Sequence, residues 1–187
     1  MIRKTLVAAG LAASMALSMP AGAMEPTLTK IKQSGSISLG YRENSIPFSF
    51  VGDDKKKARG YSIDLCEAVV ADLANQLMMP KLEVKWVPLT AQNRFDAVKK
   101  GEVDLECGNT TQTLSRRAEF DFSLMTFVDG AGLLYRAGEK PKSLAEIKDQ
   151  RVAVVVGTTT EKTLDALVNA AKLGVRLIKV KDHDTAI

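Results

Sequence analysis

The sequence lacks the features that mark several common classes of protein. It has two cysteines and one histidine in 187 residues, so a zinc or haem site has no support. No glycine-rich phosphate loop, serine–histidine–aspartate set or metal-ligand spacing is present. Without the two basic residues near its start, Arg3 and Lys4, the formal net charge falls from +4 to +2. This charge is too close to neutral to indicate a nucleic acid or a membrane surface as partner.

The longest apolar run lies at the N-terminus and predicts a secretory signal peptide over residues 1–23. Arg3 and Lys4 precede apolar residues 6–19, and Ala21-Gly22-Ala23 has the A-x-A form of a cleavage site. The run is shorter than the roughly 20 residues that a membrane span needs. No later run is apolar enough to cross a bilayer. We therefore expect cleavage after Ala23 and export.

Export bears on the state of the two cysteines. Cysteines in an oxidising compartment are more often paired than free, which favours a bond between Cys66 and Cys107. A crosslink over a loop of roughly forty residues stabilises a fold by about 4 kcal/mol in the chain-entropy model. The alternative is a pair of small, buried apolar side chains. We expect a disulfide.

After the signal peptide, short apolar strands alternate with helices. Residues 62–78 place apolar side chains at steps of three and four, which predicts a helix capped by Ser62 and ended by Pro80. A second helix is expected, capped by Thr90 and closed by Gly101. The predicted strands of this part are 37–41, 82–87 and 103–107. Strands joined through single helices favour a mostly parallel α/β sheet.

The alternation begins again after an apolar, extended stretch over residues 124–135. We expect a helix over 144–148, a strand over 152–156 buried on both faces, a helix over 161–172 and a strand over 175–180. This pattern predicts a second α/β lobe, entered through a connector at 133–137.

Two junctions between a strand and a helix are rich in polar residues. After the strand at 103–107 come Asn109, several threonines and Arg116, and ligands of open α/β sheets bind beyond the carboxyl ends of strands. Arginine matches a carboxylate with its planar fork, and hydroxyls can fill the remaining lone pairs. The alternative is a solvated turn. The second junction, residues 157–160, could expose amides to an anion, or Thr could simply cap the helix.

Several segments resemble a known family. GYSIDLCEAVV, QNRFDAVKKGEVDLECGNTT and TLSRRAEFDFS resemble the signature of the polar amino-acid family of periplasmic substrate-binding proteins. YRENSIPFSF, LTAQNR, ECGNTT, VGTTTEKTL and VKDHD are similar to its glutamate/aspartate-binding branch. The resemblance implies a two-lobed, type II periplasmic-binding-protein fold of the α/β class, with a first lobe at 24–132 and a second at 133–187. It also implies a cofactor-free monomer that delivers an amino acid to the permease of an ABC transporter in the inner membrane.

The resemblance also assigns roles to individual residues. Arg116 and Thr111 match positions that hold the α-carboxylate of the ligand. Positions around the side-chain carboxylate of an acidic ligand are matched by Arg42, Arg94 and His183. Thr159 matches a hydroxyl donor of the second lobe. The branch usually has serine where this chain has Ala91 and Asn109, and Asn109 is retained as a ligand-binding residue.

Two other functions share features with this sequence. An exported dehydratase of the cyclohexadienyl or arogenate type has the same fold, and would need a general acid or base, for which Glu43, Glu106 and His183 are candidates. Nothing in the sequence pairs them. A ligand-sensing receptor module would need a membrane span and a signalling domain.

The resemblance further predicts that the segment completing the first lobe, and the acidic group for the ligand's ammonium, lie beyond Ile187.

Overall fold

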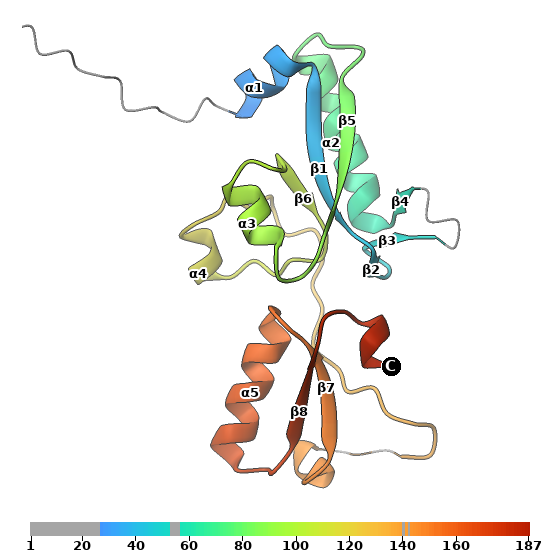
Figure 1. Cartoon of the computed structure of the whole chain (residues 1–187), viewed down its shortest axis with the longest axis vertical. Coiled ribbons are helices and arrows are strands. Elements are labelled where there is room, and N and C mark those ends of the chain that lie inside the picture. Colours follow the sequence, from blue (N-terminus) through green and yellow to red (C-terminus); the bar gives the residue numbers. More distant parts are fainter. Residues whose placement is uncertain (1–26, 53–56, 140, 142) are drawn as a thin grey trace, which may run out of the picture.

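The computed structural model describes residues 27–52, 57–139, 141 and 143–187, which form two groups of elements (Figure 1). We call the elements from α1 to α4 the first lobe and those from η1 to η2 the second lobe. Between them the described residues of 118–143 form no helix or strand. The predicted signal peptide lies outside the described residues, and the lobe boundary at 132/133 remains a prediction. None of the described helices is long and apolar enough to cross a membrane.

The first lobe is built on a parallel three-stranded sheet in the order β5-β1-β6. Its strands are β1 (Ser36–Arg42), β5 (Glu83–Leu89) and β6 (Leu105–Cys107). The central strand pairs Arg42 with Leu89 on one side and Tyr41 with Cys107 on the other. All three carboxyl ends therefore meet at one edge, and the predicted parallel sheet is confirmed.

Helix α2 (Tyr61–Gln76) packs against this sheet through its apolar stripe. Ile63, Cys66 and Val70 are buried together with Ile37 and Leu39 of β1. A disulfide joins Cys66 to Cys107, whose Cα atoms are 6.2 Å apart. The predicted disulfide is thus present in the structure, and it ties α2 to the carboxyl end of β6.

The predicted N-caps of the first lobe were wrong. Gly60 occupies the N-cap position of α2, and the Ser62 hydroxyl instead donates to the Gly108 carbonyl at 2.7 Å. Thr90 and Asn93 close a turn on each other, because each backbone amide donates to the other's side chain at 2.8 and 3.1 Å. This turn delays the second predicted helix, α3, which runs over Arg94–Lys99.

Shorter elements complete the first lobe. Helix α1 spans Thr27–Ser34, and a small antiparallel sheet contains β2 (Asn44–Ser45), β3 (Ser49–Val51) and β4 (Ala58–Arg59). Helix α4 (Leu114–Arg117) is capped by Thr113, whose hydroxyl accepts the amide of Arg116. The segment beyond α4 is held to this lobe by Phe127, whose ring lies 5.0 Å from that of Phe48 and 6.2 Å from that of Tyr61.

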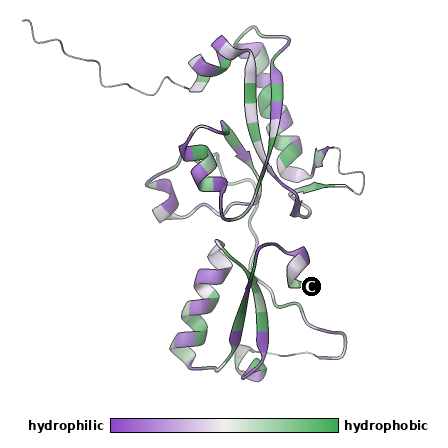
Figure 2. Cartoon of the chain, in the orientation of Figure 1, coloured by the Kyte–Doolittle hydropathy of each residue, from purple (hydrophilic) through white to green (hydrophobic). Residues whose placement is uncertain are grey.

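The second lobe repeats the strand–helix–strand pattern on a smaller scale. It contains η1 (Leu144–Ile147), β7 (Arg151–Val155), α5 (Thr159–Ala171), β8 (Arg176–Val180) and η2 (Asp184–Ala186). Strands β7 and β8 are parallel, and apolar residues alternate with polar ones along much of both lobes (Figure 2). Only Val154 and Val155 of β7 are buried, while Ala153 is exposed. Burial on both faces was therefore predicted wrongly for most of β7, because the described sheet has just two strands.

Candidate functional site

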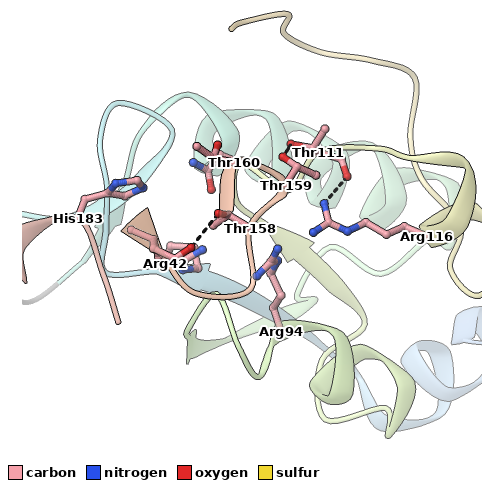
Figure 3. A pocket seen from close by; sticks show the side chains of 10 residues that line it. Arg42, Arg94, Thr111, Arg116, Thr158, Thr159, Thr160 and His183 are labelled. Carbon is pink, nitrogen blue, oxygen red and sulfur yellow. Dashed lines mark hydrogen bonds between the residues drawn. The ribbon is translucent and has the colours of Figure 1, made fainter. Parts of the chain in front are cut away.

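A cavity of about 110 Å³ lies where the two lobes meet (Figure 3). Ten residues line it, five from each lobe: Arg42, Arg94, Asn109, Thr111, Arg116, Val155, Thr158, Thr159, Thr160 and His183. All seven residues predicted from the resemblance to bind the ligand are in this set. The structure brings them together, and their contacts with a ligand remain a prediction.

The topology of the sheets explains why these residues converge. Arg42 ends β1, Arg94 opens α3 shortly after β5, and Thr111 follows β6. Because the carboxyl ends of parallel strands share an edge, residues far apart in the sequence become neighbours there. In the second lobe, Thr159 opens α5 after β7, and His183 follows β8. Each lobe thus contributes the carboxyl edge of its sheet.

Arg94 is almost completely buried, with 4% of its surface exposed, and is held from both lobes. Its Nε donates to the Thr110 hydroxyl at 2.7 Å, and its Nη1 donates to the Ala91 carbonyl. Its Nη2 donates across the lobes to the Gly157 carbonyl at 3.1 Å. These three contacts fix the orientation of the guanidinium before any ligand is considered.

Arg116 and Arg94 both contact the Gly157 carbonyl and the Phe95 ring. Its Nη1 donates to the Thr111 carbonyl at 2.7 Å, and its Nη2 lies 3.5 Å from the Gly157 carbonyl. The Phe95 ring lies below both guanidiniums, at 4.8 Å from that of Arg116 and 4.5 Å from that of Arg94. Such cation–π contacts hold two like charges side by side. Phe95 was missed in the sequence, where an aromatic residue in an amphipathic helix indicates only core packing.

The electrostatics of the cavity are dominated by burial of positive charge. Burial lowers the pKa of Arg94 to about 10, an effect that the nearby Glu106 opposes and that Arg116 and Arg42 increase. Burial also lowers the pKa of Arg42, against the influence of Glu106 and Asp182. Arg42 is 4% exposed, and its Nε has no hydrogen-bond partner among the described residues. A buried cation favours a nearby anion, because burial of an uncompensated charge is unfavourable.

The start of α5 is capped by protein side chains. The Thr158 hydroxyl accepts the amide of Glu161 at 3.1 Å and donates to the Val155 carbonyl at 2.8 Å. The carboxylate of Glu161 accepts the amide of Gly157 at 2.7 Å. The simple threonine cap, one of the two interpretations of this junction, is therefore confirmed. The Gly157 and Glu161 amides are not open to an anion.

Gly157 lies where the backbones of the two lobes come close together. Its carbonyl receives both Arg94 and Arg116, as described above, and its φ of +78° lies in the left-handed region. A Cβ at this position would lie 2.9 Å from the carbonyl oxygen of Ala91. Only glycine fits this contact without a shift of the backbone. The sequence predicted a threonine cap here and gave no signal of the contact between lobes.

Three further hydrogen bonds join the lobes beside the cavity. The hydroxyls of Thr111 and Thr159 are 3.3 Å apart. The Gln92 side chain donates to the carbonyls of Val156 at 3.3 Å and Lys181 at 3.4 Å. The cavity is therefore bounded on several sides by direct contacts between the lobes.

Comparison with known proteins identifies the class. Residues 37–182 match the model of the bacterial extracellular solute-binding proteins, family 3, and the chain belongs to this family. It is 41% identical over 157 residues to a glutamate/aspartate import solute-binding protein of Escherichia coli (strain K12), covering 84% of this chain and 52% of that protein. It is 38% identical over 172 residues to an L-glutamate/L-aspartate-binding protein of Pseudomonas aeruginosa, covering 92% and 57%. The chain thus spans about half the length of these curated relatives.

Solved structures show the same fold. An ancestral amino-acid-binding protein, described as a precursor of cyclohexadienyl dehydratase, superposes with a TM-score of 0.73 at 26% identity, covering 86% of this chain and 68% of that one. A solute receptor for L-cysteine from Neisseria gonorrhoeae gives 0.67 at 28% identity, covering 85% and 61%. The predicted type II periplasmic-binding-protein fold is confirmed. The named relatives are binding proteins, which supports the prediction of a binding protein over a dehydratase.

Proposed function

We propose that this protein is the solute-binding component of an ABC importer and captures glutamate or aspartate between its two lobes. The observation that carries this proposal is the convergence of three arginines on one small cavity, one from the end of β1, one from the start of α3 and one from α4. Two of them, Arg42 and Arg94, are buried. A ligand with two carboxylates supplies the anions that such an arrangement needs.

The roles proposed for the residues come from the family resemblance, and their shared position around the cavity supports them. Arg116 and Thr111 hold the α-carboxylate, while Arg42 and Arg94 receive the side-chain carboxylate. His183 and Thr159 add donors from the second lobe, and Asn109 adds one from the first. With a neutral ligand such as glutamine, a buried guanidinium would stay uncompensated. The same charge that attracts an acidic amino acid therefore rejects a neutral one.

The location and partner are part of the same proposal. The predicted signal peptide and the relatives named for import agree with a periplasmic monomer that hands its ligand to a permease. The dehydratase alternative has less support from the geometry. Of its three candidate acid or base residues, only His183 lines the cavity; Glu106 does not line it, and Glu43 is exposed.

Isothermal titration calorimetry of the purified protein with the twenty amino acids tests the proposal. We expect measurable binding of glutamate or aspartate, and at least about tenfold weaker binding of glutamine, since one uncompensated buried charge outweighs 1.4 kcal/mol. Circular dichroism of the same sample establishes that the protein is folded. Equal affinity for glutamine and glutamate would contradict the acidic ligand, and a folded protein that binds no amino acid would contradict the binding function.

A further inference from the structure

Glu106 is a half-buried residue with one enclosed carboxylate oxygen, and the proposed function does not use it. It lies on β6, directly before the disulfide residue Cys107, and does not line the cavity. Its Oε1 is buried and has no hydrogen-bond partner among the described residues. Burying an ionised oxygen without a partner is unfavourable unless nearby charge compensates it. The surroundings of Glu106 supply that charge.

Thr110 connects Glu106 to the cavity. The Thr110 hydroxyl accepts the Nε–H of Arg94 at 2.7 Å, which leaves its own proton free to donate to the Glu106 carboxylate. A single hydroxyl thus links the carboxylate to the hydrogen bonds of Arg94. Glu106 therefore bears on where the Arg94 guanidinium lies without touching the cavity itself.

Gly108 provides the space in which the carboxylate meets the other buried arginine. A Cβ on Gly108 would lie 2.1 Å from Glu106 Oε1 and 3.2 Å from Arg42 Cγ. The Glu106 carboxylate and the side-chain carbons of Arg42 therefore both border the space that a side chain at position 108 would fill. A side chain here would displace one of them.

The charges around Glu106 are nearly all positive. Arg42 of β1, Arg94 of α3 and Arg116 of α4 each interact with it electrostatically, and burial, which raises the pKa of Glu106, acts against all three. Asp182 of the second lobe is a further anion, and it acts on Arg42. In the absence of a ligand, Glu106 is thus the anion shared by the whole set of arginines.

We propose that Glu106 is the internal counter-ion of the arginine cavity. It is a positioning residue that holds the three guanidiniums in place and sets how strongly the site prefers an acidic ligand to a neutral one. The second part rests on the proposed function, whereas the first concerns the ligand-free protein. Because Glu106 and the ligand's carboxylates interact with the same cations, they compete. Removing the charge of Glu106 strengthens the preference for an acidic over a neutral ligand and destabilises the empty site.

Glu106→Gln tests this, because the amide keeps the shape and removes the charge. Glu102→Gln is the matched control, since Glu102 is an exposed residue shortly before β6 and its loss changes the net charge equally. In thermal melts without ligand, addition of about 50 mM sodium sulfate supplies a dianion that can occupy the arginine cavity in place of the lost carboxylate. It should raise the melting temperature of Glu106→Gln more than that of wild type or Glu102→Gln. An equal rise in melting temperature for all three proteins would overturn the counter-ion role of Glu106.

Calorimetry with glutamate and glutamine tests the second part. For Glu106→Gln we expect the ratio of the two affinities to rise by about tenfold, as for one unit charge removed within a buried cluster. A merely structural role would weaken the binding of both ligands equally. An unchanged ratio of the glutamate and glutamine affinities would therefore overturn the effect on selectivity. If wild type binds neither ligand, the proposed function fails, and the sulfate melts still decide the counter-ion.

If Glu106→Gln folds poorly, sulfate and a second variant keep the test decisive. Recovery of the Glu106→Gln fold on addition of sulfate supports the proposal, and failure to recover at any sulfate concentration contradicts it. Thr110→Val removes the linking hydroxyl while keeping the shape of the side chain. Its sulfate response should lie between those of wild type and Glu106→Gln, and a wild-type response would refute the link through Thr110.

Discussion

Replacing Gly157 by alanine separates the contact between the lobes from backbone strain. The backbone of Gly157 has a φ of +78°, where an alanine costs about 1–2 kcal/mol of folding free energy. Its new Cβ would also lie 2.9 Å from the carbonyl oxygen of Ala91 in the other lobe. This oxygen belongs to the backbone and cannot rotate away. The lobes must therefore move apart, which lengthens the hydrogen bonds from Arg94 and Arg116 to the Gly157 carbonyl.

Gly101 offers a control with the same strain and no contact. Its φ is +69°, and a Cβ there would meet no atom within 4 Å. Both variants should lower the free energy of unfolding by about 1–2 kcal/mol. Only Gly157→Ala should also weaken ligand binding, by roughly tenfold to a hundredfold, since a hydrogen bond from a charged group contributes about 1.5–3 kcal/mol.

Urea unfolding gives the first quantity and calorimetric titration with glutamate gives the second. A loss of about 1–2 kcal/mol moves the urea midpoint by roughly 0.5–1 M at an m-value near 2 kcal/mol/M. The interpretation of Gly157 as a contact between lobes is refuted if the two variants bind glutamate with the same affinity. It is refuted equally if Gly157→Ala binds as wild type does.

Three further predictions concern the anchor, the crosslink and the helix cap. Arg116→Ala should weaken glutamate binding by about 2–5 kcal/mol in calorimetry, Arg116→Lys should also weaken it because an ammonium lacks the fork, and Arg117→Ala should not. Thiol titration of the unfolded, unreduced protein should find no free thiol, and reduction should lower the unfolding free energy by about 4 kcal/mol. Hydrogen bonds from Lys179 and Gly157 lower the pKa of Glu161 below its usual value of 4.5. Its carboxylate therefore stabilises the fold above about pH 4.5, and this contribution disappears as the pH falls through the lower folded pKa. Glu161→Gln should flatten the urea midpoint measured between pH 6 and pH 3, and an unchanged acid dependence would count against the cap.

The periodicity of the sequence was sufficient to predict the scaffold. Apolar steps of three and four located α2, and the alternation of strands and helices predicted the parallel sheets. The caps were wrong at Ser62 and Thr90 because a local rule detects a hydroxyl near a helix start but not a competing partner. For Ser62 that partner is the carbonyl of Gly108, 46 residues away.

The site could be predicted to the extent that a family resemblance places individual residues. It supplied all seven candidate ligand-binding residues that line the cavity. It did not supply Phe95, the Gly157 carbonyl or the counter-ion role of Glu106. Each of these depends on which atoms meet after folding, as Arg116 and Gly157 do across 41 residues. Composition and spacing carry no record of such contacts.

On the proposed function, the disulfide bears on the thermodynamics of ligand binding as well as on folding. It fixes Cys107, and the Thr113 hydroxyl fixes the start of α4. The loop that carries Asn109 and Thr111 is therefore anchored at both ends, and most of its conformational entropy is lost on folding and not on ligand binding. Such preorganisation raises affinity without adding a contact. In the reduced protein, ligand binding would have to order the loop, so the binding entropy should become less favourable while the enthalpy changes little. The redox state of the surrounding compartment thereby enters the binding constant.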